Sequence, residues 1–181
     1  KLGIEHVSIW GFSTENWKRP ERERRFLFAL IENFIENFKD YAKEKKIRFK
    51  HIGRKDRLPK KVVSVLGAFE KETEKNNGLN VNLLLDYGGR DEIIRAVNKI
   101  IDDDKKKLNE EEFLDYLDTA KIPEPDLIIR TGGEKRLSGL MCYQCAYAEL
   151  YFLDKFFPDF NAEDLREAVE EFRRRKRRFG E

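Results

Sequence analysis

The most constraining feature of this sequence is a nearly continuous apolar run from Leu79 to Tyr87, which ends at the pair Gly88-Gly89. Runs of this kind are typical of strands in a parallel sheet, because helices on both faces keep water from every side chain. Segments with helical spacing lie before and after the run, so strands and helices alternate along the chain. This alternation predicts an α/β fold with a mainly parallel central sheet flanked by helices.

The remaining elements are predicted from periodicity and from residues that start or stop helices. Alternating or Val- and Ile-rich segments predict strands at residues 6–12, 47–52, 126–130 and 149–153. Helical spacing and capping residues predict helices at residues 21–46, 59–75, 90–102, 109–117 and 161–178. We expect a single domain over residues 1–181, because the chain has a suitable length and shows no repeat or flexible linker.

The charge balance argues against a nucleic-acid partner. The chain has 37 basic and 35 acidic side chains, and its formal net charge of +2 creates no global field that would attract nucleic acid or an anionic bilayer. The basic run from Arg173 to Arg178 is either the solvated face of a terminal helix or a local phosphate or nucleic-acid site, and we favour the solvated face. No apolar run reaches the roughly 20 residues that a membrane-spanning helix needs.

Two cysteines, Cys142 and Cys145, form a single Cys-x-x-C pair. A zinc site usually needs four ligands, and His6 and His51 are the two histidines that could complete the set. We therefore expect two ordinary thiols of a reduced intracellular protein and no zinc or redox site.

In open α/β sheets, ligands bind beyond the carboxyl ends of the strands, so the loops after the strands are the candidate sites. The loop at residues 130–138 combines glycines, which let backbone N–H groups approach an anion, with Arg130, Arg136 and Ser138 as donors. This composition predicts a diphosphate site. Alternatively, the glycines only turn the chain and the charged residues form surface ion pairs.

The segment from Ser13 to Pro20 carries a second, weaker signal. Ser13 or Asn16 could cap the following helix, and Pro20 could open it. Capping requires neither Trp17 nor Arg19, so the segment is also a candidate functional loop. The loop Gly88-Gly89-Arg90 is either an anion site or a tight turn from strand to helix.

Glu149 begins a strand of large apolar residues, where an unpaired carboxylate would be costly. A metal ion or a basic partner would explain it. An edge position facing water would explain it equally well.

The combination of these segments resembles the undecaprenyl diphosphate synthase family of cis-prenyltransferases. The segments are Phe-Ser-Thr-Glu-Asn-Trp-Lys-Arg-Pro (12–20), Asp-Tyr-Gly-Gly-Arg (86–90), Asp-Leu-Ile-Ile-Arg-Thr-Gly-Gly-Glu-Lys-Arg-Leu-Ser (126–138), Gln144 with Ala-Tyr-Ala-Glu-Leu-Tyr-Phe (146–152), Phe-Pro-Asp-Phe (157–160) and Arg-Arg-Phe-Gly (177–180). They occur in the family's order over essentially the whole chain.

The resemblance implies an activity and a cofactor. Such enzymes condense isopentenyl diphosphate with an allylic diphosphate, release pyrophosphate and leave a Z double bond, with the assistance of Mg²⁺. Motif matching implies that Arg130, Arg136 and Ser138 hold isopentenyl diphosphate and that Glu149 contributes to the Mg²⁺ site.

The resemblance also implies roles for the segment after the first strand and for the helix that follows it. Ser13 and Asn16 would take part in removing the proton, and Trp17 and Arg19 would bind substrate in a loop that closes over the reacting ends. The following helix would line a hydrophobic tunnel, although ordinary core packing explains its apolar stripe as well. The candidate tunnel residues are Phe26, Leu27, Phe28, Leu30 and Phe34.

A cytoplasmic homodimer in loose contact with a membrane is a further family expectation. The alternative function is a non-catalytic subunit of a heteromeric cis-prenyltransferase. The family's N-terminal strand and phosphate-binding loop would precede Lys1, so the chain as given is not expected to be fully active. Asp86 stands where the family usually has Asn, and residues 139–143 depart from the family's usual packing segment.

Overall fold

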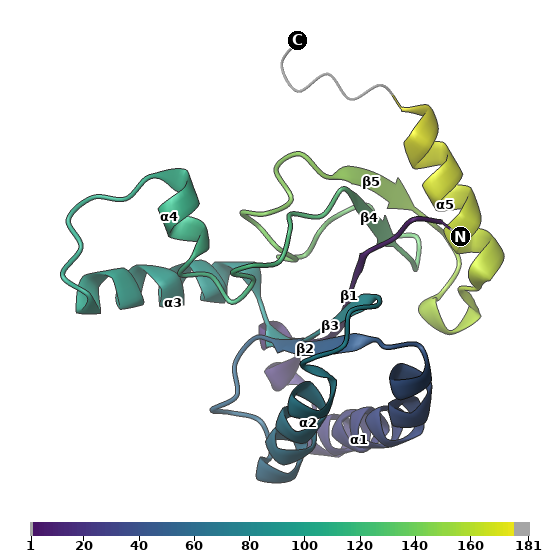
Figure 1. The fold of residues 1–181 in the computed structure, drawn as a ribbon, viewed down its shortest axis with the longest axis horizontal. Helices are drawn as coiled ribbons and strands as arrows, with labels where there is room; N and C mark the ends of the chain where they lie inside the picture. Colours follow the sequence, from purple (N-terminus) through teal and green to yellow (C-terminus); the bar gives the residue numbers. More distant parts are fainter. Residues whose placement is uncertain (1, 176–181) are drawn as a thin grey trace. The chain divides into compact units, whose positions relative to one another are not determined.

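The computed structural model describes residues 2–175, which divide into two compact units (Figure 1). Residues 3–121 form one unit, and residue 2 together with residues 122–175 forms the other. The prediction of a single domain over residues 1–181 is not tested by this division and stays a prediction.

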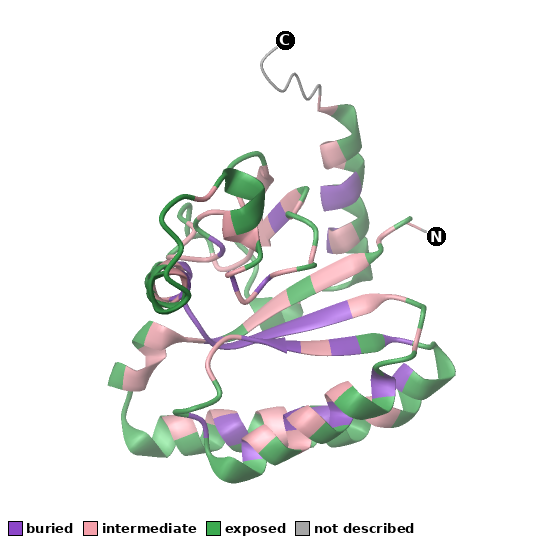
Figure 2. Ribbon diagram, turned by 60° about the vertical axis from the view of Figure 1, so that its left-hand side comes forward, coloured by how far each residue is buried: buried purple, intermediate pink, exposed green. Residues whose placement is uncertain are grey.

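The unit of residues 3–121 is built on a three-stranded parallel sheet. Its strands are β1 (His6–Ser13), β2 (Arg48–Ile52) and β3 (Asn80–Tyr87), in the order β1-β3-β2. Strand β3 is buried from residue 81 to residue 87, which confirms the expectation from its apolar run (Figure 2). Ser13 pairs with Tyr87 in parallel strands, so the segments that follow β1 and β3 leave the sheet at the same edge, the one formed by the carboxyl ends of the strands.

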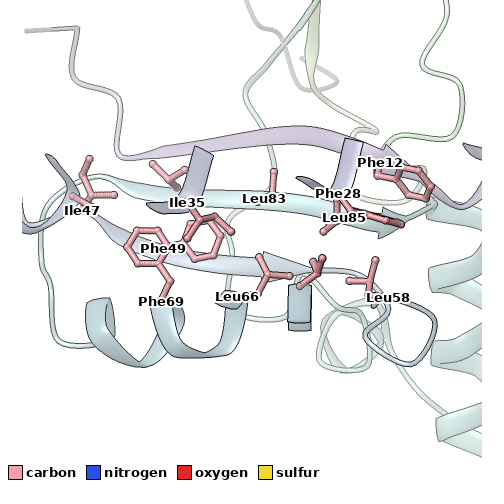
Figure 3. Close-up of a cluster of buried hydrophobic side chains, with 13 residues drawn as sticks. Phe12, Phe28, Ile35, Ile47, Phe49, Leu58, Leu66, Phe69, Leu83 and Leu85 are labelled. Atoms are coloured by element: carbon pink, nitrogen blue, oxygen red, sulfur yellow. The ribbon is translucent and has the colours of Figure 1, made fainter. Parts of the chain in front are cut away.

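Helices α1 (Glu21–Glu44) and α2 (Lys60–Thr73) cover one face of this sheet (Figure 2). Each begins directly after a proline, which suits a helix start because the first N–H groups have no partner inside the helix. The core between the helices and the sheet consists of aliphatic and phenylalanine side chains (Figure 3). Its members include Phe12, Phe28, Ile35, Phe49, Leu66, Phe69, Leu83 and Leu85.

Helix α1 carries two apolar faces, and the residues predicted to line a tunnel divide between them. Phe28 is buried in the core, and Leu27 packs against it. The side of α1 with Phe26, Leu30 and Phe34 is exposed, and these residues keep 64%, 47% and 45% of their surface accessible. Core packing therefore explains one face of the apolar stripe and leaves the other unexplained.

Helix α3 (Gly89–Asp102) starts immediately after β3, and α4 (Glu110–Leu114) follows it. The predicted cap of α4 is confirmed: the Glu112 N–H donates to Asn109 Oδ1 at 2.9 Å, and the Asn109 N–H donates to Glu112 Oε2 at 3.0 Å. The helix is shorter than the predicted segment 109–117 and ends at Leu114.

The unit that contains residues 122–175 has a parallel pair of strands, β4 (Leu127–Arg130) and β5 (Glu149–Phe152). The 3-10 turn η2 (Phe157–Asp159) and helix α5 (Ala162–Arg174) follow. The predicted helix at 161–178 is confirmed as far as Arg174, and its residues 176–178 lie outside the described part. Within residues 2–175, no helix has both the length and the apolar character that a bilayer crossing requires.

Candidate active site

The segment from Ser13 to Arg19 folds into the short 3-10 helix η1 (Thr14–Lys18), not into an open loop. Asn16 holds both ends of this turn: its Oδ1 accepts the Ser13 N–H at 2.9 Å, and its carbonyl oxygen accepts the Arg19 N–H at 3.0 Å. The Ser13 and Asn16 side chains are partly exposed, and Arg19 is exposed beside Glu23 at 3.9 Å. Three of the predicted residues are therefore brought together at the carboxyl end of β1.

Trp17, the fourth predicted residue of this segment, is held on several sides. Its ring meets Phe12 edge-on at 5.4 Å between centroids and lies tilted against Phe28 at 5.8 Å. Its Nε1–H donates to Asp86 Oδ1 at 2.8 Å, and Arg24 Nη1 donates to the Trp17 carbonyl oxygen at 2.6 Å. The indole is thus fixed by packing and by hydrogen bonds at the same time.

Asp86 is a fully buried carboxylate at the end of β3, with none of its surface exposed. Arg57 grips it with two donors: Nε contacts Oδ2 at 2.9 Å, and Nη2 contacts Oδ1. A charge removed from water is costly unless it is paired and hydrogen-bonded, and Arg57 supplies both. Asp86, where the resemblance leads us to expect Asn, thus forms an ion pair next to Trp17.

The turn after β3 explains Gly88. A Cβ atom at Gly88 would lie 2.3 Å from Thr14 Oγ1, which is far inside contact distance, so only glycine lets η1 come this close. Helix α3 begins at Gly89, as expected for a tight turn from strand to helix, and Arg90 is exposed.

Arg57 is a residue that the sequence analysis missed. It lies in the loop after β2, at the sheet edge where the segments after β1 and β3 also leave. A sequence signal for a charged site was present in this loop, since two arginines, a lysine and an aspartate follow a predicted strand at residues 54–57. The contact with Asp86 depends on a sequence separation of 29 residues, which no local pattern reveals.

In the second unit, the loop after β4 brings three other predicted residues together. Arg130 Nη1 donates to Ser138 Oγ at 2.9 Å and also to the carbonyl oxygen of Arg136. The Arg136 side chain is 61% exposed and pairs with Glu134, so the predicted surface ion pair is present. The loop therefore displays two guanidinium groups and a hydroxyl group within a few residues.

The glycines of this loop have a different role from the one predicted. The N–H groups of Gly132 and Gly133 donate to the carbonyl oxygens of Lys155 and Leu153, both at 2.9 Å. Their φ values of +88° and +74° lie in the left-handed region that favours glycine. The interpretation of these two glycines as turn residues is thus supported, and their N–H groups are already engaged within the unit.

Glu149 is paired with a base, one of the explanations left open by the sequence. Its Oε2 accepts from Arg175 Nη1 at 2.7 Å, and Arg175 also contacts Glu171 at 3.0 Å. The hydrogen bond to Glu149 raises the pKa of Arg175 above its ordinary value. Arg175 was not predicted as the partner of Glu149, since the two residues are 26 positions apart and no local pattern joins them.

Glu149 and Arg130 start from separated backbone positions on this pair of strands. Glu149 starts β5 opposite Leu127, whereas Arg130 ends β4, three residues further along the pair. At about 3.3 Å per residue, the separation along the strands is roughly 10 Å. Among residues 2–175, no group of three or more His, Cys, Asp or Glu side chains is arranged to hold a metal ion.

Cys142 and Cys145 form no disulfide with each other. Both are free; Cys142 is exposed and Cys145 is partly buried. Burial raises the pKa of the Cys145 thiol, which disfavours the reactive thiolate.

Comparison with known proteins decides the family. Residues 1–180 match the family model described as "Putative undecaprenyl diphosphate synthase". This chain belongs to that family. The isoprenyl transferase of Aquifex aeolicus is 44% identical over 180 residues, which cover 99% of this chain and 78% of the relative.

Solved structures agree with the undecaprenyl diphosphate synthase family assignment. A probable undecaprenyl diphosphate synthase from Campylobacter jejuni matches with a TM-score of 0.90 and 38% identity, over 98% of this chain and 84% of that one. Lavandulyl diphosphate synthase from Lavandula x intermedia, in complex with dimethylallyl diphosphate, matches with a TM-score of 0.95 and 35% identity, over 99% and 80%. The predicted fold class, family and cis-prenyltransferase function are thereby confirmed.

Proposed function

We propose that this family member condenses isopentenyl diphosphate with an allylic diphosphate to give a Z-polyprenyl diphosphate. In this reaction the allylic C–O bond breaks and pyrophosphate leaves with the electron pair. A new C–C bond forms to isopentenyl diphosphate, and a proton is lost as the new double bond appears. The protein must therefore hold two diphosphates, stabilise the departing charge and direct the proton.

The loop at residues 130–138 is the proposed holder of isopentenyl diphosphate. The observation that carries this assignment is the contact of Arg130 with Ser138 Oγ and with the carbonyl oxygen of Arg136, on a loop whose arginine and serine side chains reach solvent. Forked guanidinium donors suit phosphate oxygens, and the hydroxyl adds a further donor. Since the Gly132 and Gly133 N–H groups are engaged, side chains rather than the glycine backbone supply the donors.

The segment with Ser13, Asn16, Trp17 and Arg19 is the proposed partner of the reacting ends. Arg19 would stabilise the charge of the departing diphosphate, and Trp17 would exclude water from the cation-like allylic carbon. A hydroxyl and an amide are too weakly basic to keep a proton. We therefore assign Ser13 and Asn16 to orienting the proton's path toward the released pyrophosphate.

Mg²⁺ is the proposed cofactor, with Glu149 as one ligand. Magnesium in phosphate-transfer sites is commonly held by one or two carboxylates together with substrate phosphates, so a single carboxylate fits this chemistry. When bound, the ion would neutralise diphosphate charge. Arg175 holds Glu149 in this structure, so binding would require exchange of partners. We expect Glu149→Ala to weaken Mg²⁺ binding by at least about tenfold, since loss of a group that only supports a metal ligand already costs roughly 10- to 100-fold, measured by calorimetric titration with diphosphate substrate present.

The remaining proposals concern assembly and location. We assign the exposed apolar side of α1, with Phe26, Leu30 and Phe34, to contact with the growing hydrocarbon chain. A cytoplasmic homodimer in peripheral contact with the membrane is the proposed working form.

The deciding experiment is incorporation of labelled isopentenyl diphosphate by the full-length protein, with farnesyl or geranylgeranyl diphosphate and Mg²⁺. Products with Z double bonds are expected. A folded, full-length protein that incorporates no label would instead act as the non-catalytic subunit of a heteromeric enzyme.

A further inference from the structure

We propose that the ion pair between the buried Asp86 and the partly exposed Arg57 is a positioning device for Trp17, and through it for the segment of residues 13–19. Neither Asp86 nor Arg57 is assigned a contact with substrate. Both act by holding the indole, so the inference rests on the proposed function of this segment.

Trp17 and Arg57 both donate to the same oxygen atom of Asp86. Asp86 Oδ1 accepts the Trp17 Nε1–H at 2.8 Å and also accepts from Arg57 Nη2, while Arg57 Nε binds Oδ2 at 2.9 Å. The fork of Arg57 fixes the plane of the carboxylate, and the carboxylate fixes the direction of the indole N–H.

Two cations also lie beside the Trp17 ring. The guanidinium carbon of Arg57 is 5.7 Å from the ring centroid, and that of Arg24 is 5.4 Å away. Both distances fall within the range of cation–π attraction. Arg57 thus contacts Trp17 twice, through the carboxylate and over the ring.

Stability alone is a poor explanation for this arrangement. Burying the Asp86 carboxylate costs several kcal/mol, which its attraction to the partly exposed Arg57 only offsets, and apolar side chains of similar volume often stabilise a protein as well. Apolar side chains cannot select one orientation of the indole N–H. The backbone at Asp86 also adopts φ +51°, an uncommon value for a residue other than glycine. A costly charge on an uncommon backbone conformation is better explained by the geometry it imposes on Trp17.

The same edge leaves little room for an alternative placement of η1. The side chain of Thr14, the first residue of η1, occupies the space that a Cβ atom at Gly88 would need. Residues 14 and 17 are therefore both fixed to the end of β3, one by close approach and the other by a hydrogen bond to a charge. We infer that the segment is pre-organised before substrate arrives, which lowers the entropic cost of reaching a reactive geometry.

The test uses the indole N–H resonance of Trp17 in the full-length protein, assigned with Trp17→Phe. Trp10 is a built-in reference, because its Nε1–H donates to the Tyr87 carbonyl oxygen at 3.2 Å in the same unit. Arg57→Gln removes the fork, and Arg57→Lys keeps the charge without the fork. Asp86→Asn keeps an oxygen acceptor but turns an amide N–H₂ toward Arg57.

We expect hydrogen exchange of the Trp17 indole to be faster by roughly tenfold in Arg57→Gln, with a smaller change in Arg57→Lys and an unchanged Trp10. Arg54→Gln is the matched control: it removes an ion-paired arginine from the same loop, bound to Asp56 and Asp91, and should leave Trp17 unchanged. An unchanged Trp17 in both Arg57→Gln and Asp86→Asn would overturn the proposal. Equal acceleration of both indoles would also overturn it, because that result means general loosening.

Kinetics separate this inference from the proposed function. In Arg57→Gln we expect kcat to fall by roughly tenfold while KM for isopentenyl diphosphate stays the same, because its proposed ligands lie in the other unit. A faster-exchanging Trp17 with unchanged kcat would overturn the positioning role and leave the proposed function intact. An inactive parent protein whose Trp17 still responds to Arg57→Gln would refute the proposed function but not the anchoring of Trp17.

Discussion

The ends of β3 and β4 both combine arginine with oxygen acceptors, yet they do so in opposite environments. At β3, the carboxylate of Asp86 is completely buried and saturated by Arg57 and Trp17. At β4, Arg136 and Glu134 keep 61% and 50% of their side chains exposed. The first arrangement has its donors and acceptors committed to one another, whereas the second keeps donors within reach of a ligand.

The difference follows from solvation. The buried Asp86 carboxylate must keep its partner, since separation leaves this charge in an environment that cannot hydrate it. An exposed pair is typically worth 0–1 kcal/mol and is exchanged for water or for a phosphate at little cost. Rigidity is therefore expected at β3 and ligand exchange at β4.

The largest effect on stability is expected for Asp86→Ala. Loss of the carboxylate leaves Arg57 and the Trp17 Nε1–H without their acceptor. Arg57 keeps 35% of its side chain exposed, so it can bind water instead. We expect the free energy of unfolding to fall by about 2–3 kcal/mol, measured by urea denaturation. Glu134→Ala at the other end should change it by less than about 0.5 kcal/mol. Equal losses of unfolding free energy in Asp86→Ala and Glu134→Ala would contradict the proposed difference between a buried, rigid end at β3 and an exposed end at β4.

The next effect tests the close approach of η1 to β3. Gly88→Ala would place a methyl group 2.3 Å from Thr14 Oγ1 and 3.3 Å from Thr14 Cβ. We expect a loss of about 1–3 kcal/mol in the free energy of unfolding, because the packed edge must shift. Thr14→Ala in the same protein should restore part of that loss. A Gly88→Ala protein as stable as the parent would show that the edge at β3 yields easily.

At the exposed end, Arg136→Ala should act on binding and not on folding. Removal of a charge-assisted donor is expected to raise KM for isopentenyl diphosphate by about tenfold, with stability unchanged within about 0.5 kcal/mol. Glu134→Gln is the control, because it releases Arg136 without removing it. Unchanged kinetics in Arg136→Ala would exclude this residue from the diphosphate site.

The smallest effect concerns His51, which is 5% exposed in β2 and has its Nε2 2.9 Å from the Leu85 carbonyl oxygen. Burial lowers the pKa of His51 below its ordinary value of 6.5. The unfolded chain then binds a proton more readily than the folded one, so stability is full above about pH 6.5 and falls as the pH drops toward the folded pKa. The slope should be at most about 1.4 kcal/mol per pH unit, measured by urea denaturation between pH 7.5 and 5.5.

His51→Gln should flatten this pH dependence, because glutamine keeps a donor for Leu85 but does not titrate in that range. A slope that persists in His51→Gln would assign the dependence to other groups.

Much of the molecule follows from local patterns. The apolar run at residues 79–87 predicted a buried parallel strand, and Asn109 with Glu112 predicted a capping box; both are confirmed. Periodicity and capping depend on residues a few positions apart, so the sequence carries them directly. The resemblance to the family is equally local, since it rests on short motifs in a fixed order.

The partners of charged side chains could not be obtained in this way. Arg57 with Asp86, and Arg175 with Glu149, are separated by 29 and 26 residues. The engagement of the Gly132 N–H by the Lys155 carbonyl oxygen is also a contact between distant segments. Sequence alone determined which strands and helices form, which family the chain joins and which side chains carry the candidate chemistry. The tertiary structure decided which of those charges are buried and saturated and which remain available, because desolvation depends on every neighbour in space and not on neighbours along the chain.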